Sequence, residues 1–152
     1  MGAWVLIAAV VAVLAFGAWR AAVNGRFRGT HAVKGSGDEP AADAAGRDPS
    51  PLDGLLPSGT TLGERATLLQ FSTAFCAPCR ATRRTLADVA EVVPGVAHVE
   101  IDAEHHLDLV RRLRVLRTPT TLVLDATGRE VTRAAGAPRK EQVLNALAQA
   151  SP

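Results

Sequence analysis

The chain contains two cysteines, Cys76 and Cys79, separated by two residues. This spacing suits a dithiol that opens and closes as a disulfide, half of a metal site, or a small structural cross-link. A structural disulfide would close a very short loop here and would restrict the unfolded chain little. The residues around the pair must therefore decide between redox chemistry and metal binding.

Both flanks of the cysteine pair have the pattern of regular structure. Residues 67–71 form an apolar run of strand length, and residues 81–92 carry apolar side chains at helical spacing. Pro78 suits the first turn of that helix because its missing N–H would have no partner there. Cys76 then lies at the helix N-terminus, where unpaired N–H groups favour a thiolate. Cysteines in such motifs have pKa values of roughly 3.5 to 7.5, so we predict that Cys76 is a nucleophile.

Two motifs resemble the thioredoxin superfamily. The segment from Phe71 to Arg80, FSTAFCAPCR, resembles the family's active-site segment, in which an apolar strand and an aromatic residue precede C-G-P-C-K. The segment from Arg117 to Thr121, RTPTT, resembles the loop that holds a cis-proline against the dithiol. The resemblance covers about residues 66–148. It implies that Cys76 and Cys79 are catalytic, and that Thr118 and Pro119 position the substrate.

The same resemblance indicates residues that tune the dithiol. Gln70 stands six residues before Cys76, where the family usually carries a buried aspartate that helps to deprotonate the second cysteine. His98 aligns with the neighbouring lysine of that site and could titrate near neutral pH if it is solvated. We expect these two residues to tune the pair, together with Phe75, Ala77 and Pro78. Because glutamine is not a base, we expect Gln70 to slow proton removal from Cys79.

The predicted elements after residue 66 alternate between strands and helices. The apolar patterns predict strands at 67–71, 96–101, 120–124 and 129–133, and helices at 81–92, 102–116 and 139–149. Parallel strands joined by helices, then an antiparallel hairpin and a closing helix, predict a thioredoxin-like three-layer α/β sandwich with a central mixed sheet. The first strand and helix of the family core are not found in this pattern.

The N-terminus from Gly2 to Trp19 contains no charged residue. Its length of roughly 27 Å as a helix matches the hydrocarbon core of a bilayer. We interpret residues 2–19 as a single transmembrane anchor rather than a cleaved signal peptide, because no basic residue precedes the apolar run. Basic residues follow it instead, which favours a cytoplasmic domain at the cell membrane, with the extracytoplasmic side as the alternative.

Between the anchor and the domain, residues 20–61 have the composition of a flexible linker, rich in Gly, Ser, Pro, Ala and Asp. Alternatively, Leu52, Leu55 and Leu56 could dock at the edge of the domain. We assign residues 62–150 to the thioredoxin-like domain.

These patterns predict a membrane-tethered thiol–disulfide oxidoreductase of the protein-disulfide reductase type. We expect no cofactor beyond the Cys76–Cys79 disulfide, no resident metal, a monomer, and protein thiols or disulfides as partners, including a protein electron donor or acceptor. The alternatives are a tethered copper carrier, in which histidines such as His98, His105 or His106 help the two cysteines, and a non-catalytic adaptor. No basic block interleaved with aromatics suggests nucleic acid. Fifteen arginines against two lysines are typical of an actinobacterial, GC-rich genome.

Overall fold

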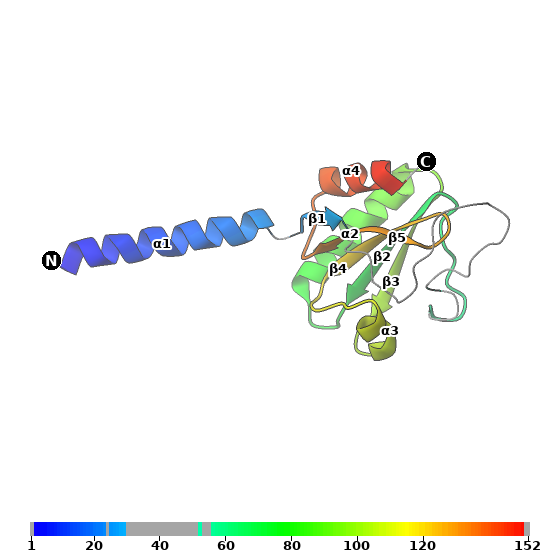
Figure 1. The fold of residues 1–152 in the computed structure, drawn as a ribbon, viewed down its shortest axis with the longest axis horizontal. Helices are drawn as coiled ribbons and strands as arrows, with labels where there is room; N and C mark the ends of the chain where they lie inside the picture. The colour runs from blue at the N-terminus through cyan, green and yellow to red at the C-terminus, as the bar shows by residue number, and fades with distance from the viewer. Residues whose placement is uncertain (1, 24, 30–51, 53–55, 151–152) are drawn as a thin grey trace, which may run out of the picture.

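The computed structural model describes residues 2–23, 25–29, 52 and 56–150. An N-terminal helix leads into an α/β domain (Figure 1). The elements in chain order are α1 (Gly2–Val23), β1 (Phe27–Gly29), β2 (Ala66–Ser72), α2 (Ala77–Val92), β3 (Val96–Asp102), α3 (Leu107–Arg112), β4 (Thr120–Asp125), β5 (Glu130–Ala135) and α4 (Lys140–Ala150).

The five strands form one mixed sheet in the order β1-β5-β4-β2-β3. β2 pairs with β3 in parallel, and the pairs β2–β4, β4–β5 and β5–β1 are antiparallel. All seven residues of β2 are buried, as expected for a central strand that is covered on both faces. The prediction of a thioredoxin-like fold with a central mixed sheet is confirmed.

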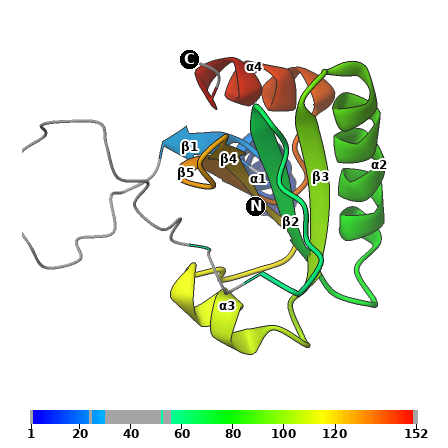
Figure 2. The ribbon, with the colours of Figure 1, turned by 90° about the vertical axis from the view of Figure 1, so that its right-hand side faces the viewer.

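Alternate residues of the strands build a core on each face of the sheet. On one face, Leu68 and Val123 pack against Leu86 of α2 and Val143 of α4. On the other face, Phe71 belongs to a second cluster with residues of β3, β4 and the α3 region (Leu69, Ile101, Leu109, Val115, Leu122 and Leu124). Figure 2 shows α2 and α4 covering one side of the sheet, with α3 on the other. This arrangement gives the three layers.

The segment predicted as a linker contributes to the fold at two places. β1 adds a fifth strand at the β5 edge of the sheet, inside the range 20–61. Leu52 is only 3% exposed and Leu56 packs beside it on the second core cluster, as in the docked alternative. Leu55 and the linker positions 24, 30–51 and 53–54 lie outside the described residues.

The helix predicted over residues 102–116 is shorter, and α3 covers only six residues. The Asp102 carboxylate accepts hydrogen bonds from the Glu104 N–H and the His105 ring, which form a local turn in place of a helix start. At the other end Arg114 has φ of 51°, outside the right-handed helical region.

The N-terminal helix α1 covers the predicted apolar segment and continues to Val23. Its large apolar side chains from Trp4 to Trp19 are exposed on all sides of the helix, which projects from the domain (Figure 1). Within the described residues, no helix meets the length and hydropathy required of a membrane span.

Candidate active site

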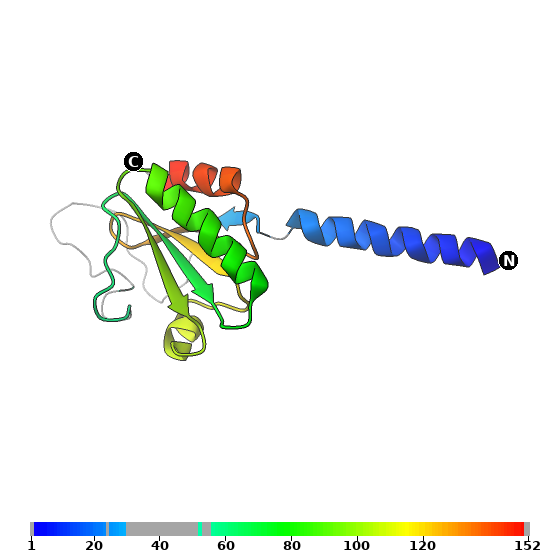
Figure 3. The ribbon, with the colours of Figure 1, turned by 180° about the vertical axis from the view of Figure 1, so that it is seen from behind.

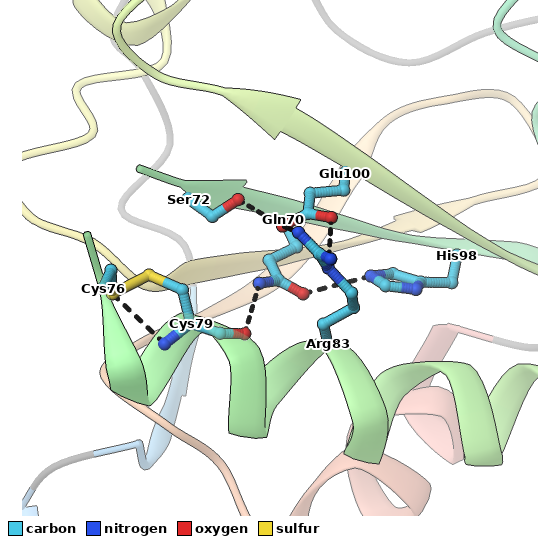
Figure 4. A network of polar contacts seen from close by, with 7 residues as sticks. All are labelled: Gln70, Ser72, Cys76, Cys79, Arg83, His98 and Glu100. Atoms are coloured by element: carbon cyan, nitrogen blue, oxygen red, sulfur yellow. Dashed lines mark hydrogen bonds and ion pairs between the residues drawn. A yellow bond between two sulfur atoms is a disulfide. The ribbon is translucent and has the colours of Figure 1, made fainter. Parts of the chain in front are cut away.

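A disulfide joins Cys76 and Cys79 where β2 is followed by α2, with the two Cα atoms 5.1 Å apart (Figure 4). Cys76 is the N-cap of α2, and Pro78 lies in its first turn, where its missing N–H leaves no hydrogen bond unmade. Because only residues 73–76 separate β2 from α2, the cysteine pair lies just beyond the carboxyl end of a buried strand. The sequence pattern predicts the same position for the pair, between a strand and a helix.

The two sulfurs lie in different surroundings. Cys79 is 2% exposed, whereas Cys76 is half-buried, so Cys76 is the more accessible of the two cysteines. The backbone N–H of Cys79 donates to Cys76 Sγ at 3.1 Å. In the reduced state the same N–H, at the positive end of the helix, would stabilise a thiolate on Cys76.

The loop before β4 brings its predicted residues to the same edge of the sheet. The Thr118–Pro119 peptide bond is cis, and the Thr118 hydroxyl lies 3.4 Å from that of Thr73, in the loop that leads to Cys76. The Pro119 carbonyl accepts from the Gly136 N–H at 2.7 Å. The structure therefore holds Thr118 and Pro119 beside the segment that carries the disulfide.

Gln70 lies fully buried between the second cysteine and His98. Its Nε2 donates to the Cys79 carbonyl at 3.0 Å, and its Oε1 lies 3.1 Å from His98 Nε2 (Figure 4). The amide thus accepts from the imidazole N–H and donates to the backbone of α2. Burial lowers the pKa of His98, which the Glu100 carboxylate partly offsets and the Arg83 guanidinium reinforces. His98 is therefore neutral near pH 7, with its proton on Nε2.

The comparisons with known proteins agree with this geometry. The family model described as "Thioredoxin-like domain" matches residues 60–151, more than half of the chain. The chain belongs to this thioredoxin-like family. It is 29% identical over 85 residues to "Thioredoxin H-type" of Fagopyrum esculentum, which covers 56% of this chain and 72% of the relative.

Further relatives support the same conclusion. "Thioredoxin H-type 1" of Nicotiana tabacum is 28% identical over 89 residues, covering 59% of this chain and 70% of that protein. The crystal structure of Fasciola hepatica thioredoxin superposes with a TM-score of 0.53 at 19% identity, covering 66% of this chain and 88% of the other. At that identity the superposition supports the fold alone.

The thioredoxin-like domain carries a second polar cluster that sequence reasoning missed. Glu100 on β3 accepts from Arg83 of α2, with atoms 2.5 and 2.8 Å apart, and from the Ser72 hydroxyl (Figure 4). Burial raises the pKa of Glu100, but the hydrogen bonds from Arg83 and Ser72 lower it more, so it lies below its ordinary value of 4.5. The alternation of His98, Glu100 and Asp102 along β3 was the signal that could have found this polar face.

Other predicted site residues of the thioredoxin-like domain lie on its surface. Phe75, directly before the first cysteine, is fully exposed, and Ala77 and Pro78 are exposed beside it. Leu116, in the loop before the cis-proline, is 93% exposed. Phe75, Ala77 and Pro78 are therefore exposed apolar residues on either side of the half-buried Cys76 along the chain.

The histidines considered for a metal site have other partners. His105 Nδ1 lies 2.9 Å from Asp102 Oδ2, His106 Nδ1 lies 3.0 Å from the Asp102 carbonyl, and His98 faces Gln70. In the part of the chain that the structure describes, no three His, Cys, Asp or Glu residues gather as a possible metal site. Nothing in the described geometry therefore favours the copper-carrier alternative.

Proposed function

We propose that this protein is a membrane-tethered protein-disulfide reductase that exchanges disulfides with partner proteins through Cys76 and Cys79. The observation that carries the proposal is the pair of unequal sulfurs, one half-buried and one nearly inaccessible, at the start of α2 beside a cis-proline. This asymmetry suits a nucleophile that meets the partner and a second thiol that acts only within the protein.

The reaction begins with the reduced pair. The Cys76 thiolate attacks one sulfur of a partner disulfide, a mixed disulfide forms, and the other partner sulfur leaves as a thiolate. Cys79 then loses its proton and attacks Cys76 Sγ, which closes the internal disulfide and releases the second partner thiol. Two electrons have passed to the partner. A dithiol of an electron-donor protein restores the reduced pair by the reverse steps.

The cis-proline loop would position the partner. Its place beside the cysteine segment supports a role in which an extended piece of the partner lies along Thr118 and Pro119 and presents its disulfide to Cys76. Exposed Phe75 and Leu116 would cover apolar side chains of that piece.

The α1 helix serves in this proposal as a single-pass anchor in the cell membrane. Among the described residues, no helix has the length and hydropathy required of a membrane span, so exposure, charge and tryptophan placement in α1 carry the anchor proposal. The large apolar side chains of α1 are exposed, residues 2–19 carry no charge, and Trp4 and Trp19 stand near the two ends. The basic residues Arg20 and Arg26, with others after them, favour the cytoplasmic side for the domain.

The test uses the full chain in lipid nanodiscs. We expect it to reduce insulin disulfides with dithiothreitol as the electron donor, Cys76→Ser to abolish turnover, and Cys79→Ser to accumulate a mixed disulfide with the substrate. A redox titration giving about −270 mV would support a cytoplasmic reductase, and a much more oxidising potential would oppose it. Full cellular function in Cys76→Ser would instead support the adaptor alternative.

A further inference from the structure

The chain coming from α1 joins the sheet at the edge that carries the disulfide. Phe27 pairs with Ala134 of β5, and the Gly25 N–H donates to the Ala135 carbonyl at 3.0 Å. Ala135 pairs with Thr120 of β4, which pairs with Phe71 near the carboxyl end of β2. The start of β1 and the end of β2 therefore lie at the same end of the strands. This border of the sheet, which runs across the strand ends, is here called the dithiol edge.

The connection between the helix and this edge is short. Val23 ends α1, and Gly25 is already hydrogen-bonded to the sheet, so two residues span at most about 7 Å. Gly25 is buried with φ of 75°, and a Cβ there would lie 2.1 Å from the Ala137 carbonyl oxygen. Only glycine fits this close approach of two backbones.

The same contact reaches the residues around the disulfide. The Ala135 carbonyl that accepts from Gly25 also accepts from Arg117 Nη2 at 2.7 Å, and Arg117 precedes Thr118 and the cis-proline. Figures 1 and 3 show α1 leaving the domain on the side where α2 begins. In the sequence, one residue therefore separates the end of α1 from Gly25, which is hydrogen-bonded at the dithiol edge.

Exposed side chains at the dithiol edge suit a bilayer surface. Phe75 and Leu116 present apolar groups, and Arg80, Arg114 and Arg117 are exposed cations. Aromatic and basic side chains favour the headgroup region of anionic membranes. The acids Asp102, Glu104 and Asp108 lie at the same end of the strands, since Asp102 pairs with Ser72. They belong to β3 and the α3 region, however, at the opposite side of the sheet from β1.

We propose that the dithiol edge faces the membrane and that Cys76 reduces a disulfide of an integral membrane protein at the bilayer surface. The proposal rests on the proposed function, because it requires both the anchor and the dithiol. In the exchange, two electrons pass from the Cys76–Cys79 dithiol to the membrane partner, and a donor protein dithiol replaces them. A partner free in solution would have to enter between the domain and the lipid.

The test compares two label positions on the full chain in vesicles of phosphatidylcholine and phosphatidylglycerol. Cys79→Ser leaves native Cys76 for a fluorescent label at the dithiol edge. Ala126→Cys in a Cys76→Ser, Cys79→Ser background places the matched label in the β4–β5 turn at the opposite edge, roughly 20 Å away along the strands. With quencher-bearing lipid headgroups, we expect quenching to be several-fold stronger at Cys76. Equal quenching, or stronger quenching at Ala126, would overturn the proposal.

A second variant separates the short connection from the rest of the molecule. Inserting about ten Gly and Ser residues after Val23, a flexible reach on the order of 17 Å, should make the two labels nearly equal in quenching. The insertion should also slow reduction of a model transmembrane peptide whose disulfide lies next to the bilayer, while reduction of soluble insulin, which the lipid no longer obstructs, should not slow. An unchanged rate with the membrane peptide would count against the proposed partner.

Vesicle flotation distinguishes failure of the membrane-facing dithiol edge from failure of the proposed membrane-tethered reductase. If the full chain does not float with the vesicles, the anchor fails and the inference falls with it. If the chain floats and reduces insulin but shows no difference between the labels, only the inference is wrong.

Discussion

At the scale of single residues, the thioredoxin-like site is marked by the buried amide of Gln70. It donates a hydrogen bond to the Cys79 carbonyl and accepts one from the His98 ring. The amide therefore holds the backbone of the second cysteine in place, but it cannot act as a base. We infer that Cys79 loses its proton slowly, which would lengthen the life of the mixed disulfide.

Replacing Gln70 tests this role. Gln70→Asp should speed release of the mixed disulfide by about tenfold or more at a pH where the new carboxylate is ionised, because a positioned base contributes roughly 10²- to 10⁴-fold. Gln70→Asn is the matched control, with the shape of aspartate but no base. Rapid-mixing measurements of the resolving step would compare them. The same rate in both variants at every pH would refute a proton-transfer role.

His98 predicts a pH dependence of stability. Burial lowers the pKa of folded His98 below its ordinary value of 6.5, so just below pH 6.5 the unfolded state binds more protons than the folded state. Stability is therefore lost as the pH falls through this window, by less than about 1.4 kcal/mol per pH unit for one proton.

Denaturation by urea, followed by circular dichroism between pH 5 and pH 8, measures this loss. His98→Gln keeps a donor for Gln70 but does not titrate, so its stability should fall less steeply. Parallel pH curves for the two proteins would show that His98 contributes nothing. The titration of Glu100 lies below this window, because hydrogen bonds from Arg83 and Ser72 keep its pKa below 4.5.

At the scale of elements, the strand β1 is the feature that joins helix and sheet. It is three residues long, and ladder hydrogen bonds to β5 and the contact of Gly25 with the 136–138 loop hold it in place. A three-residue strand has few ladder hydrogen bonds, so the hydrogen bond from the Gly25 N–H to the Ala135 carbonyl is a large part of what holds it. Gly25 makes this bond because no side chain keeps it away from the Ala137 backbone.

Gly25→Ala should weaken β1 pairing more than a comparable change elsewhere. Gly59→Ala is the control, since Gly59 also has positive φ, at 87°, but nothing lies within 4 Å of a Cβ there. The backbone penalty for each is about 1 to 2 kcal/mol, and only Gly25→Ala adds the clash with Ala137. Hydrogen exchange of the β1–β5 amides and urea denaturation would measure the difference. Equal losses in the two variants would mean that the close contact is unimportant.

At the scale of the whole molecule, residues far apart in the sequence complete one core. Leu52 lies before the sheet's first central strand, yet it is buried against Phe71, Ile101 and the α3 region. In this way the domain covers the sheet face that α2 and α4 leave open.

Leu52→Ala should therefore destabilise the domain by about 2 to 5 kcal/mol, the usual cost of truncating a buried leucine. Val92→Ala, at a position 62% exposed at the end of α2, should change stability by no more than about 0.5 kcal/mol. Urea denaturation of both variants in nanodiscs would compare them. A loss below about 1 kcal/mol for Leu52→Ala would show that its segment is not part of the cooperative core.

The sequence by itself determined the dithiol, its place between a strand and a helix, and the order of the main elements. Those features depend on local patterns: two cysteines, Pro78 in the first helical turn, and runs of apolar residues at period 2 or 3.6. Cis-Pro119 could be expected from its motif, and the structure places it beside the cysteine segment.

Only the tertiary structure decided what depends on contacts between distant segments. β1 is too short and too polar to have a strand pattern, and it exists because the open edge of β5 pairs with it. The Gln70–His98 and Ser72–Glu100–Arg83 contacts require the parallel register of β2 with β3 and the packing of α2 above them. The course of the chain from α1 to the dithiol edge follows from strand directions, which no local pattern specifies.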